Sequence, residues 1–301
     1  MAVLVLGTVA LDDVKTPSGV KKAMLGGSAA HFSMSARLFD DVHIVGVVGK
    51  DFPKAHRDFL RRKGVDLSAL TVADGKTFRW SGEYKKEDLN SAITHDTRLG
   101  VLADYVPALT DRQRGMSHVF LANLAPVVQE RLLSLMKAPA LVGLDTMNLW
   151  INTALKDLRR LIKRADIFVL NDGETRLLTG ERNLVKAAAA ILAMGPRVVV
   201  VKKGEHGVYV VSRKFQFAFP AYPIGRVVDP TGAGDTFAGG MFGYLSKVRR
   251  MDEKSFRRAV IYGSVLASFN VEGFGMAKTA PLTIREADRR LKEYLQFSAT
   301  A

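Results

Sequence analysis

Short runs of aliphatic residues recur along the chain, and each is followed by a polar or glycine-containing turn and then by a helix-like stretch. Helical patterns include Ala187–Met194 and Ala233–Leu245. Near-continuous apolar strands that alternate with helices are typical of a parallel sheet covered on both faces. The sequence therefore predicts a doubly wound α/β fold with a mostly parallel sheet. The runs that we interpret as strands are Val3–Leu6, His43–Val48, His118–Ala122, Leu141–Asp145, Ile167–Leu170 and Val198–Lys202.

The interval of residues 71–99 interrupts this alternation. It contains β-type residues and turns but no stretch long enough to form a helix that covers a sheet. Together with residues 13–24, it predicts a small β-sheet inserted in a single domain of residues 1–301, a length that one large α/β domain can have. Such a sheet could close over a ligand as a lid and exclude water, or it could be a hairpin without a functional role.

The composition excludes several classes of function. Because the chain has no cysteine, it has no disulfide framework, thiolate nucleophile or cysteine-based zinc site. The basic residues, which give a formal net charge of +14, lie in separate segments with acidic residues nearby, and this favours a solvated basic surface. No apolar run reaches the roughly 18 residues of a membrane span, and the apolar N-terminus lacks the basic start of a signal peptide. We expect a cytoplasmic location, with no nucleic-acid or membrane partner.

The strongest local signal is the sequence DPTGAGDTF at Asp229–Phe237, directly before a helical pattern. The small residues Gly232, Ala233 and Gly234 leave backbone N–H groups uncovered at a helix start, where the helix dipole is positive. Such a turn can bind an anion. Asp235, in the first helical turn beside it, could take the proton from an attacking hydroxyl.

Asp235 also has a simpler interpretation. An acidic residue near a helix N-terminus contributes a few tenths to about 1 kcal/mol of stability without any catalytic role. Three further glycines in the same helix, Gly239, Gly240 and Gly243, would each be unfavourable by about 1 kcal/mol relative to alanine unless the backbone packs closely there. This packing favours a functional site over the simpler interpretation.

The chain contains neither of the usual nucleotide-binding fingerprints, G-x-x-x-x-G-K-[ST] or G-x-G-x-x-G after a strand. Instead, DPTGAGDTF resembles the signature of the ribokinase-like (PfkB) family of sugar and nucleoside kinases, and the resemblance covers nearly the whole chain. It implies a kinase that uses ATP and Mg²⁺ to phosphorylate a hydroxyl of a small sugar or nucleoside. The resemblance also implies that Asp235 is the base and that Gly232, Ala233 and Gly234 form the anion hole. The alternative is a non-catalytic nucleotide- or sugar-binding regulatory protein on the same fold.

Other positions match the family on the substrate side. The resemblance implies that Asp12 holds a substrate hydroxyl and that the Gly26-Gly27 pair contacts the substrate. Ser28 stands where the ribokinase-type motif has a lysine, which is more similar to nucleoside kinases. Arg79, within the predicted lid, is a further candidate for contact with the substrate. Simpler readings are a solvated turn for Asp12 and a tight strand-to-helix turn for the glycines.

Asn171 and Glu174 follow the strand Ile167–Leu170 and match the family element N-x-x-E, which organises Mg²⁺ and phosphate through water. The same two residues also form the pattern of a capping box, worth about 1 kcal/mol to any helix. Both roles can coexist. A position at the carboxyl end of a parallel strand is where ligands bind in such sheets.

The sequence KKGEHG at residues 202–207 resembles the nucleotide-binding turn of the family, which implies that Lys203, Gly204 and Gly207 contact the nucleotide. Thr231 is implied to bind the nucleotide or to join Asp229 in a site for a monovalent cation, with K⁺ as the candidate ion. The residues Asp145–Asn148 end another predicted strand and could border the ligand or cap the next helix.

Several properties stay open at this point. The acceptor could be a nucleoside, a sugar or a sugar phosphate, and nothing in the sequence separates these decisively. The oligomeric state is also open, and a homodimer formed through the lid is one expectation. The six histidines show no metal-ligand spacing, and we assign none of them a role.

Overall fold

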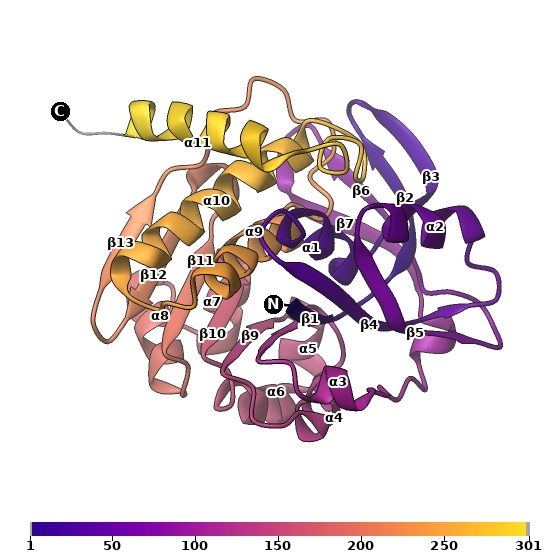
Figure 1. Ribbon diagram of the computed structural model, residues 1–301. Coiled ribbons are helices and arrows are strands. Elements are labelled where there is room, and N and C mark those ends of the chain that lie inside the picture. Colours follow the sequence, from indigo (N-terminus) through magenta and orange to yellow (C-terminus); the bar gives the residue numbers. More distant parts are fainter. Residues whose placement is uncertain (1, 299–301) are drawn as a thin grey trace.

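The computed structural model describes residues 2–298, and its centre is a nine-stranded sheet (Figure 1). The strands of this sheet are β1 (Ala2–Leu6), β4 (Asp41–Gly49), β5 (Val65–Ala73), β8 (His118–Leu121), β9 (Leu141–Asp145), β10 (Ile167–Asn171), β11 (Val198–Lys202), β12 (Val208–Ser212) and β13 (Gln216–Phe219). Their order across the sheet is β13-β12-β11-β10-β9-β8-β1-β4-β5. Neighbours from β11 to β5 are parallel, whereas β12 and β13 continue the sheet in antiparallel pairing.

Helices cover both faces of this sheet, so the predicted doubly wound α/β fold is confirmed. One face carries α1 (Ser28–Ala36), α2 (Lys54–Arg62), α9 (Ala233–Val248) and α10 (Glu253–Val271). The other carries α3 (Asp111–Arg114), α4 (Pro126–Leu135), α5 (Asn148–Thr153), α6 (Leu155–Ile162), α7 (Asp172–Thr179) and α8 (Leu184–Ala193). Helix α11 (Ile284–Ser298) packs outside α10, and the short 3-10 helices are η1 (Gly100–Leu102) and η2 (Gly204–His206).

The alternation of side chains along each strand explains why the strands are apolar throughout. In β1, Val3 and Val5 pack into one core and Leu4 and Leu6 into the other. Successive side chains of a strand point to opposite faces, and here neither face meets water. All six strands expected from the sequence lie in this sheet.

A second, four-stranded sheet consists of β2 (Ala10–Thr16), β3 (Gly19–Gly26), β6 (Arg79–Lys85) and β7 (Asp88–Arg98), in the order β3-β2-β6-β7. This small sheet lies at the upper right of Figure 1 and corresponds to the predicted β insertion. Its first segment is longer than the expected residues 13–24. Its second segment begins later than expected, because residues 71–73 belong to β5 of the large sheet.

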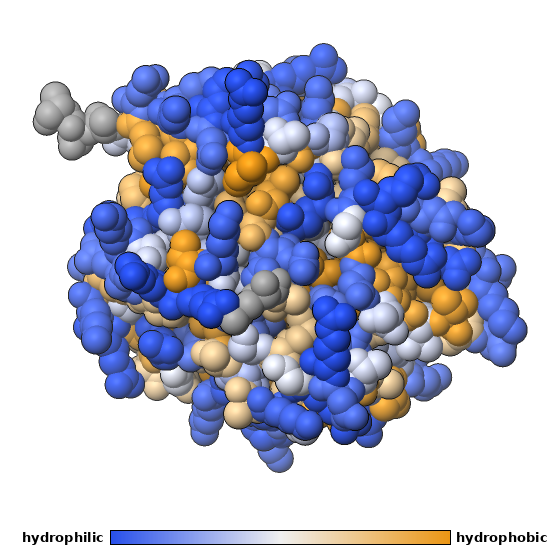
Figure 2. Space-filling view, in the orientation of Figure 1, coloured by the Kyte–Doolittle hydropathy of each residue, from blue (hydrophilic) through white to orange (hydrophobic). Residues whose placement is uncertain are grey.

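The face of the molecule seen in Figure 2 is mostly hydrophilic, with apolar residues in small groups between polar side chains. Within residues 2–298, no helix combines the length and apolarity needed to cross a bilayer.

Candidate active site

The carboxyl ends of β9, β10 and β11 meet at one edge of the large sheet, as parallel neighbours must. They bring together Asp145, Asn171 and Lys202, the last residues of these three strands. Helix α9 begins beside them, because a Cβ atom on Gly234 would lie 3.0 Å from the Nζ atom of Lys202. The structure therefore joins the DPTGAGDTF segment to strand ends far away in the sequence.

The turn that starts α9 depends on glycine. Gly232 has a φ of +75°, and a Cβ atom there would lie 2.3 Å from the ring of His31. The N–H of Ala233 donates to the carbonyl of Pro230 at 3.1 Å. Within residues 2–298, the N–H groups of Gly232, Gly234 and Asp235 have no hydrogen-bond acceptor. The N–H groups expected to bind an anion were those of Gly232, Ala233 and Gly234. In the structure the N–H group of Asp235 takes the place of that of Ala233.

A buried polar network holds this turn in place. The Nδ2 group of Asn270 donates to the carbonyl of Thr231 at 2.8 Å. Its Oδ1 atom accepts from the Thr236 hydroxyl at 3.0 Å and lies 3.2 Å from Nδ1 of His31. Sequence reasoning missed Asn270 and His31, because their contacts are tertiary and no local pattern encodes them.

Asp235 lies partly buried in the first turn of α9. Burial raises the pKa of its carboxyl to about 7, the negative charge of Asp145 adds to this effect, and Lys202 opposes it. A carboxyl with a pKa near neutrality can exchange protons efficiently at physiological pH. An aspartate that only stabilised the start of a helix would not need a raised pKa. The environment of Asp235 therefore suits proton transfer.

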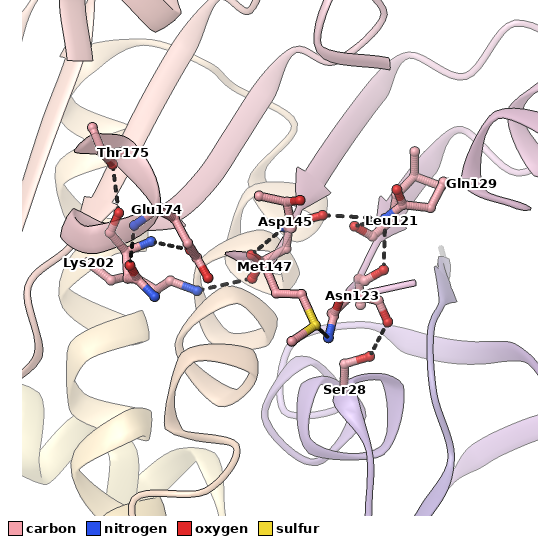
Figure 3. A network of polar contacts seen from close by, with 12 residues as sticks. Ser28, Leu121, Asn123, Gln129, Asp145, Met147, Glu174, Thr175 and Lys202 are labelled. Carbon is pink, nitrogen blue, oxygen red and sulfur yellow. Dashed lines mark hydrogen bonds and ion pairs between the residues drawn. The ribbon is translucent and has the colours of Figure 1, made fainter. Parts of the chain in front are cut away.

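Lys202, Asp145 and Glu174 form a charged cluster beside Asp235 (Figure 3). The Nζ group of Lys202 donates to Oδ2 of Asp145 at 3.0 Å, and Oδ1 of Asp145 accepts from the N–H of Thr146 at 2.7 Å. Burial raises the pKa of Glu174 to about 7, with Lys202 opposing and Asp145 reinforcing the shift. For Lys202, burial disfavours the charge, yet the surrounding carboxylates raise its pKa.

This cluster contains Lys202, which sequence reasoning did not assign, rather than its neighbour Lys203. Successive side chains of a strand alternate in direction, so only one of two adjacent lysines can face the site. The N–H of Lys203 donates to the carbonyl of Gly207 at 2.8 Å. Its predicted contact with the nucleotide stays a prediction.

The two glycines of the turn after β11 have positive φ, +55° at Gly204 and +87° at Gly207. A Cβ atom on Gly207 would lie 2.0 Å from the carbonyl oxygen of Phe219, so this position admits only glycine.

Asn171 and Glu174 make the capping box of helix α7. The Oδ1 atom of Asn171 accepts from the N–H of Glu174, and Oε2 of Glu174 accepts from the N–H of Asn171, both at 2.7 Å. The capping interpretation is therefore confirmed. The role of the same residues in organising Mg²⁺ stays a prediction, and their place within the charged cluster is compatible with it.

The structure brings together Asp12 and the glycine pair, the residues predicted to contact the substrate. Asp12 is 5% exposed, and a Cβ atom on Gly26 would lie 1.8 Å from its Oδ2 atom. Burial raises the pKa of Asp12 to about 7, the N–H of Gly27 lowers it, and the charges of Asp229 and Asp235 raise it. Asp12 is thus a buried carboxyl, and its interpretation as a solvated turn residue is wrong.

Ser28 is held by protein groups. Its N–H donates to the Thr8 hydroxyl at 2.8 Å, and its Oγ atom accepts from the N–H of Thr8 at 3.1 Å and lies 3.3 Å from the Asn123 carbonyl (Figure 3). Arg79 begins β6, where its charge helps to lower the pKa of Asp51. In the described chain, the Arg79 side chain makes no hydrogen bond or ion pair with the carboxylates of the site. Contact of Ser28 and Arg79 with the substrate stays a prediction.

The small sheet reaches this site at three places. The Thr16 hydroxyl donates to the carbonyl of Val228 at 2.7 Å, just before the DPTGAGDTF segment. Asn90 touches the turn after β11, because a Cβ atom on Gly204 would lie 2.0 Å from its Oδ1 atom. The third contact comes from Tyr84 on β6. Burial raises the pKa of Tyr84 to about 12, and its surroundings include Thr231 and the carboxylates of Asp229, Asp12 and Asp235. Sequence reasoning missed Tyr84, because only the register of the small sheet shows which residues face the site.

Asp229 is fully buried and binds backbone groups with both carboxylate oxygens. Oδ1 accepts from the N–H of Thr231 at 2.9 Å, and Oδ2 accepts from the N–H of Gly275 at 3.0 Å. The Thr231 carbonyl already accepts from Asn270. Both carboxylate oxygens of Asp229 and the Thr231 carbonyl therefore have protein donors, and the cation stays a prediction.

Comparison with known proteins gives consistent results. The family model described as "pfkB family carbohydrate kinase" matches residues 4–282. The cytidine kinase of Thermococcus kodakarensis is 30% identical over 257 residues, which cover 83% of this chain and 90% of that protein. The ribokinase of Haemophilus influenzae is 27% identical, with coverage of 85% of this chain and 84% of that protein.

The fold is also similar to that of solved structures. A putative ribokinase II from E. coli, solved in complex with ATP and Mg²⁺, superposes with a TM-score of 0.80 at 20% identity and covers 97% of this chain and 99% of that one. The similarity thus extends over nearly the whole length of both chains.

Proposed function

The chain belongs to the pfkB family of carbohydrate kinases, and from this premise we propose that it transfers the γ-phosphoryl group of ATP to a hydroxyl of a small sugar or nucleoside. The observation that carries this proposal is Asp235, whose pKa of about 7 suits a general base and which stands beside backbone N–H groups without acceptors in residues 2–298. A turn that only capped a helix would need neither property.

The proposed reaction moves one proton and one phosphoryl group. Asp235 takes the proton of the acceptor hydroxyl, and the acceptor oxygen forms a bond to the γ-phosphorus. The bond between that phosphorus and the bridging oxygen breaks, and its electron pair leaves with ADP. The N–H groups of Gly232, Gly234 and Asp235 would stabilise the negative charge on the transferring phosphoryl oxygens, because they are already oriented before the reaction begins.

The charges of the site suit a divalent cation. Asp145, Glu174 and Asp235 supply three carboxylates against the single positive charge of Lys202, and the pKa values of Glu174 and Asp235 are raised to about 7. No group of three or more metal-ligating side chains lies close enough in residues 2–298 to hold a metal ion directly. Mg²⁺ commonly uses one or two carboxylates with substrate phosphates and water, so Glu174 and Asn171 would hold it in that way. When bound, it would neutralise phosphate charge.

Asp12 and the Gly26-Gly27 pair are the proposed acceptor site. A buried carboxylate is a strong acceptor for the hydroxyls of a ribose or a sugar, and glycines let a substrate lie against the backbone. The similar proteins named above include both a nucleoside kinase and a sugar kinase, so both classes of acceptor belong in the test.

A cytoplasmic location and a homodimer through the small sheet stay predictions.

The experiment is a screen of acceptors with the purified protein, ATP and Mg²⁺. ADP formation and the mass of the product are measured for nucleosides, pentoses, hexoses and sugar phosphates. We expect one class to give a kcat/KM at least about tenfold above the others, because a buried polar site rejects acceptors that leave its groups unpaired. A folded protein that binds ATP but phosphorylates none of these acceptors would contradict the proposed function.

A further inference from the structure

Lys202 is a nearly buried lysine whose ammonium group has hydrogen-bonding capacity to spare. Its side chain is 18% exposed and lies at the carboxyl end of β11. An ammonium group has three N–H donors, and within residues 2–298 the Nζ atom of Lys202 makes one hydrogen bond, to Asp145. A largely buried cation with unused donors is unfavourable unless water or a ligand completes its contacts.

The unused donors lie beside the start of α9. Any residue with a Cβ atom at position 234 would place that atom 3.0 Å from Nζ, so the glycine makes room for the ammonium group. The N–H of Gly234 has no acceptor in the described chain. An anion bound by this N–H is therefore within reach of Lys202 as well.

The charges around Lys202 point the same way. It faces Asp145 at 3.0 Å, and Glu174 and Asp235 also act on it, so one cation stands among three carboxylates. Without Lys202, an incoming triphosphate would meet only negative side chains in this cluster. If Lys202 served only to join β9 to β11 through an ion pair, Asp145 would be sufficient as its partner.

We propose that Lys202 contacts the γ-phosphate of the bound nucleotide and stabilises the phosphoryl group during its transfer, a role that rests on the proposed function. As the acceptor oxygen bonds to phosphorus and the bond to ADP breaks, Lys202 keeps its proton and balances the charge on the phosphoryl oxygens. The proton of the acceptor goes to Asp235. Asp145 holds the lysine in position through the ion pair seen in Figure 3.

The test compares Lys202→Met with Arg197→Met. Arg197 lies just before the amino end of β11 and pairs with Asp166 at 3.4 Å, so it is a charged residue at the opposite end of the same strand. Isothermal titration measures the Kd of the non-hydrolysable ATP analogue AMPPNP and of ADP, each with Mg²⁺. We expect Lys202→Met to weaken AMPPNP at least about tenfold and ADP less than about threefold, because only the analogue carries a γ-phosphate. Arg197→Met leaves both affinities unchanged.

This comparison needs no acceptor, so it separates the role of Lys202 from the proposed function. If the acceptor screen fails while Lys202→Met discriminates between the two nucleotides, the proposed function is lost and the γ-phosphate contact stands. Equal affinities of wild type and Lys202→Met for AMPPNP would overturn the proposal, as would an equal loss for AMPPNP and ADP. Lys202→Gln provides the same comparison if the methionine variant does not fold.

Discussion

Three carboxyl groups at the site share a pKa raised to about 7, and Asp235 is the one on which the proposed chemistry depends. A base must be ionised to accept a proton. Turnover is therefore expected to be present above about pH 7 and to fall as the pH drops through that value, because burial holds the proton on Asp235 more tightly than on an exposed aspartate.

The measurement is kcat/KM, which reports groups of the free enzyme, from about pH 5 to about pH 9, with a slope of about one on the acid limb of the logarithmic plot. A plateau that extends down to about pH 5 would mean that no group with the raised pKa takes part in the reaction.

Gly232 gives a second prediction at the scale of one residue. Gly232→Ala is expected to destabilise the protein by about 1 to 3 kcal/mol and to lower turnover at least about tenfold, because the new Cβ atom meets His31 and the φ of +75° is strained. Gly225→Ala is the matched control, since no atom lies within 4 Å of a Cβ there. Urea unfolding measures the free energy of unfolding, and steady-state kinetics measure turnover. Equal values of both quantities for the two variants would contradict the proposed role of the turn at Gly232.

Residue roles could be predicted from sequence only where a motif fixes the position. Asp235 and Asp12 became candidates in this way, and the structure brings both into one electrostatic environment, while their roles stay predictions. Lys202 could not be separated from Lys203, because the choice depends on the side-chain direction of the last residue of a strand. Asn270 and His31 stabilise the turn through tertiary contacts that no local pattern encodes.

At the scale of elements, the central parallel strands were predictable because their apolar residues serve two cores. The strands β5, β12 and β13 were missed, and all three lie toward the edges of the sheet. In β5, exposed and half-buried positions dilute the apolar signal. Edge strands bury fewer side chains, so their pattern resembles that of loops.

The small sheet is expected to change its dynamics when ligands bind. Its residues Tyr84 and Asn90 reach the start of α9 and the turn at Gly204, where the acceptor and the nucleotide are proposed to lie. Amides of β6 and β7 should therefore exchange more slowly with AMPPNP and acceptor bound, because closing over a ligand suppresses local opening.

Hydrogen exchange followed by mass spectrometry tests this expectation, with helix α6, which packs against α4 and α5, as an internal control. Unchanged exchange in β6 and β7 at saturating ligand would show that the small sheet does not act as a lid.

At the scale of the whole molecule, one continuous nine-stranded sheet is packed between helices on both faces. Such an arrangement unfolds as a unit, because neither layer of helices keeps its core without the sheet. We predict a single calorimetric transition for residues 1–301, with calorimetric and van't Hoff enthalpies that agree. Two resolved transitions would contradict the assignment of one domain.

The central claim concerns Asp235, and its most direct test is turnover by Asp235→Asn with the best acceptor from the screen. We predict that kcat falls about 10² to 10⁴-fold while the Kd for ATP changes less than about threefold, because the variant removes a base and keeps the backbone donors. Asp157→Asn, in the first turn of α6, is the control for a simple helix-start role and should keep full activity. Turnover by Asp235→Asn within about threefold of wild type would exclude Asp235 as the base.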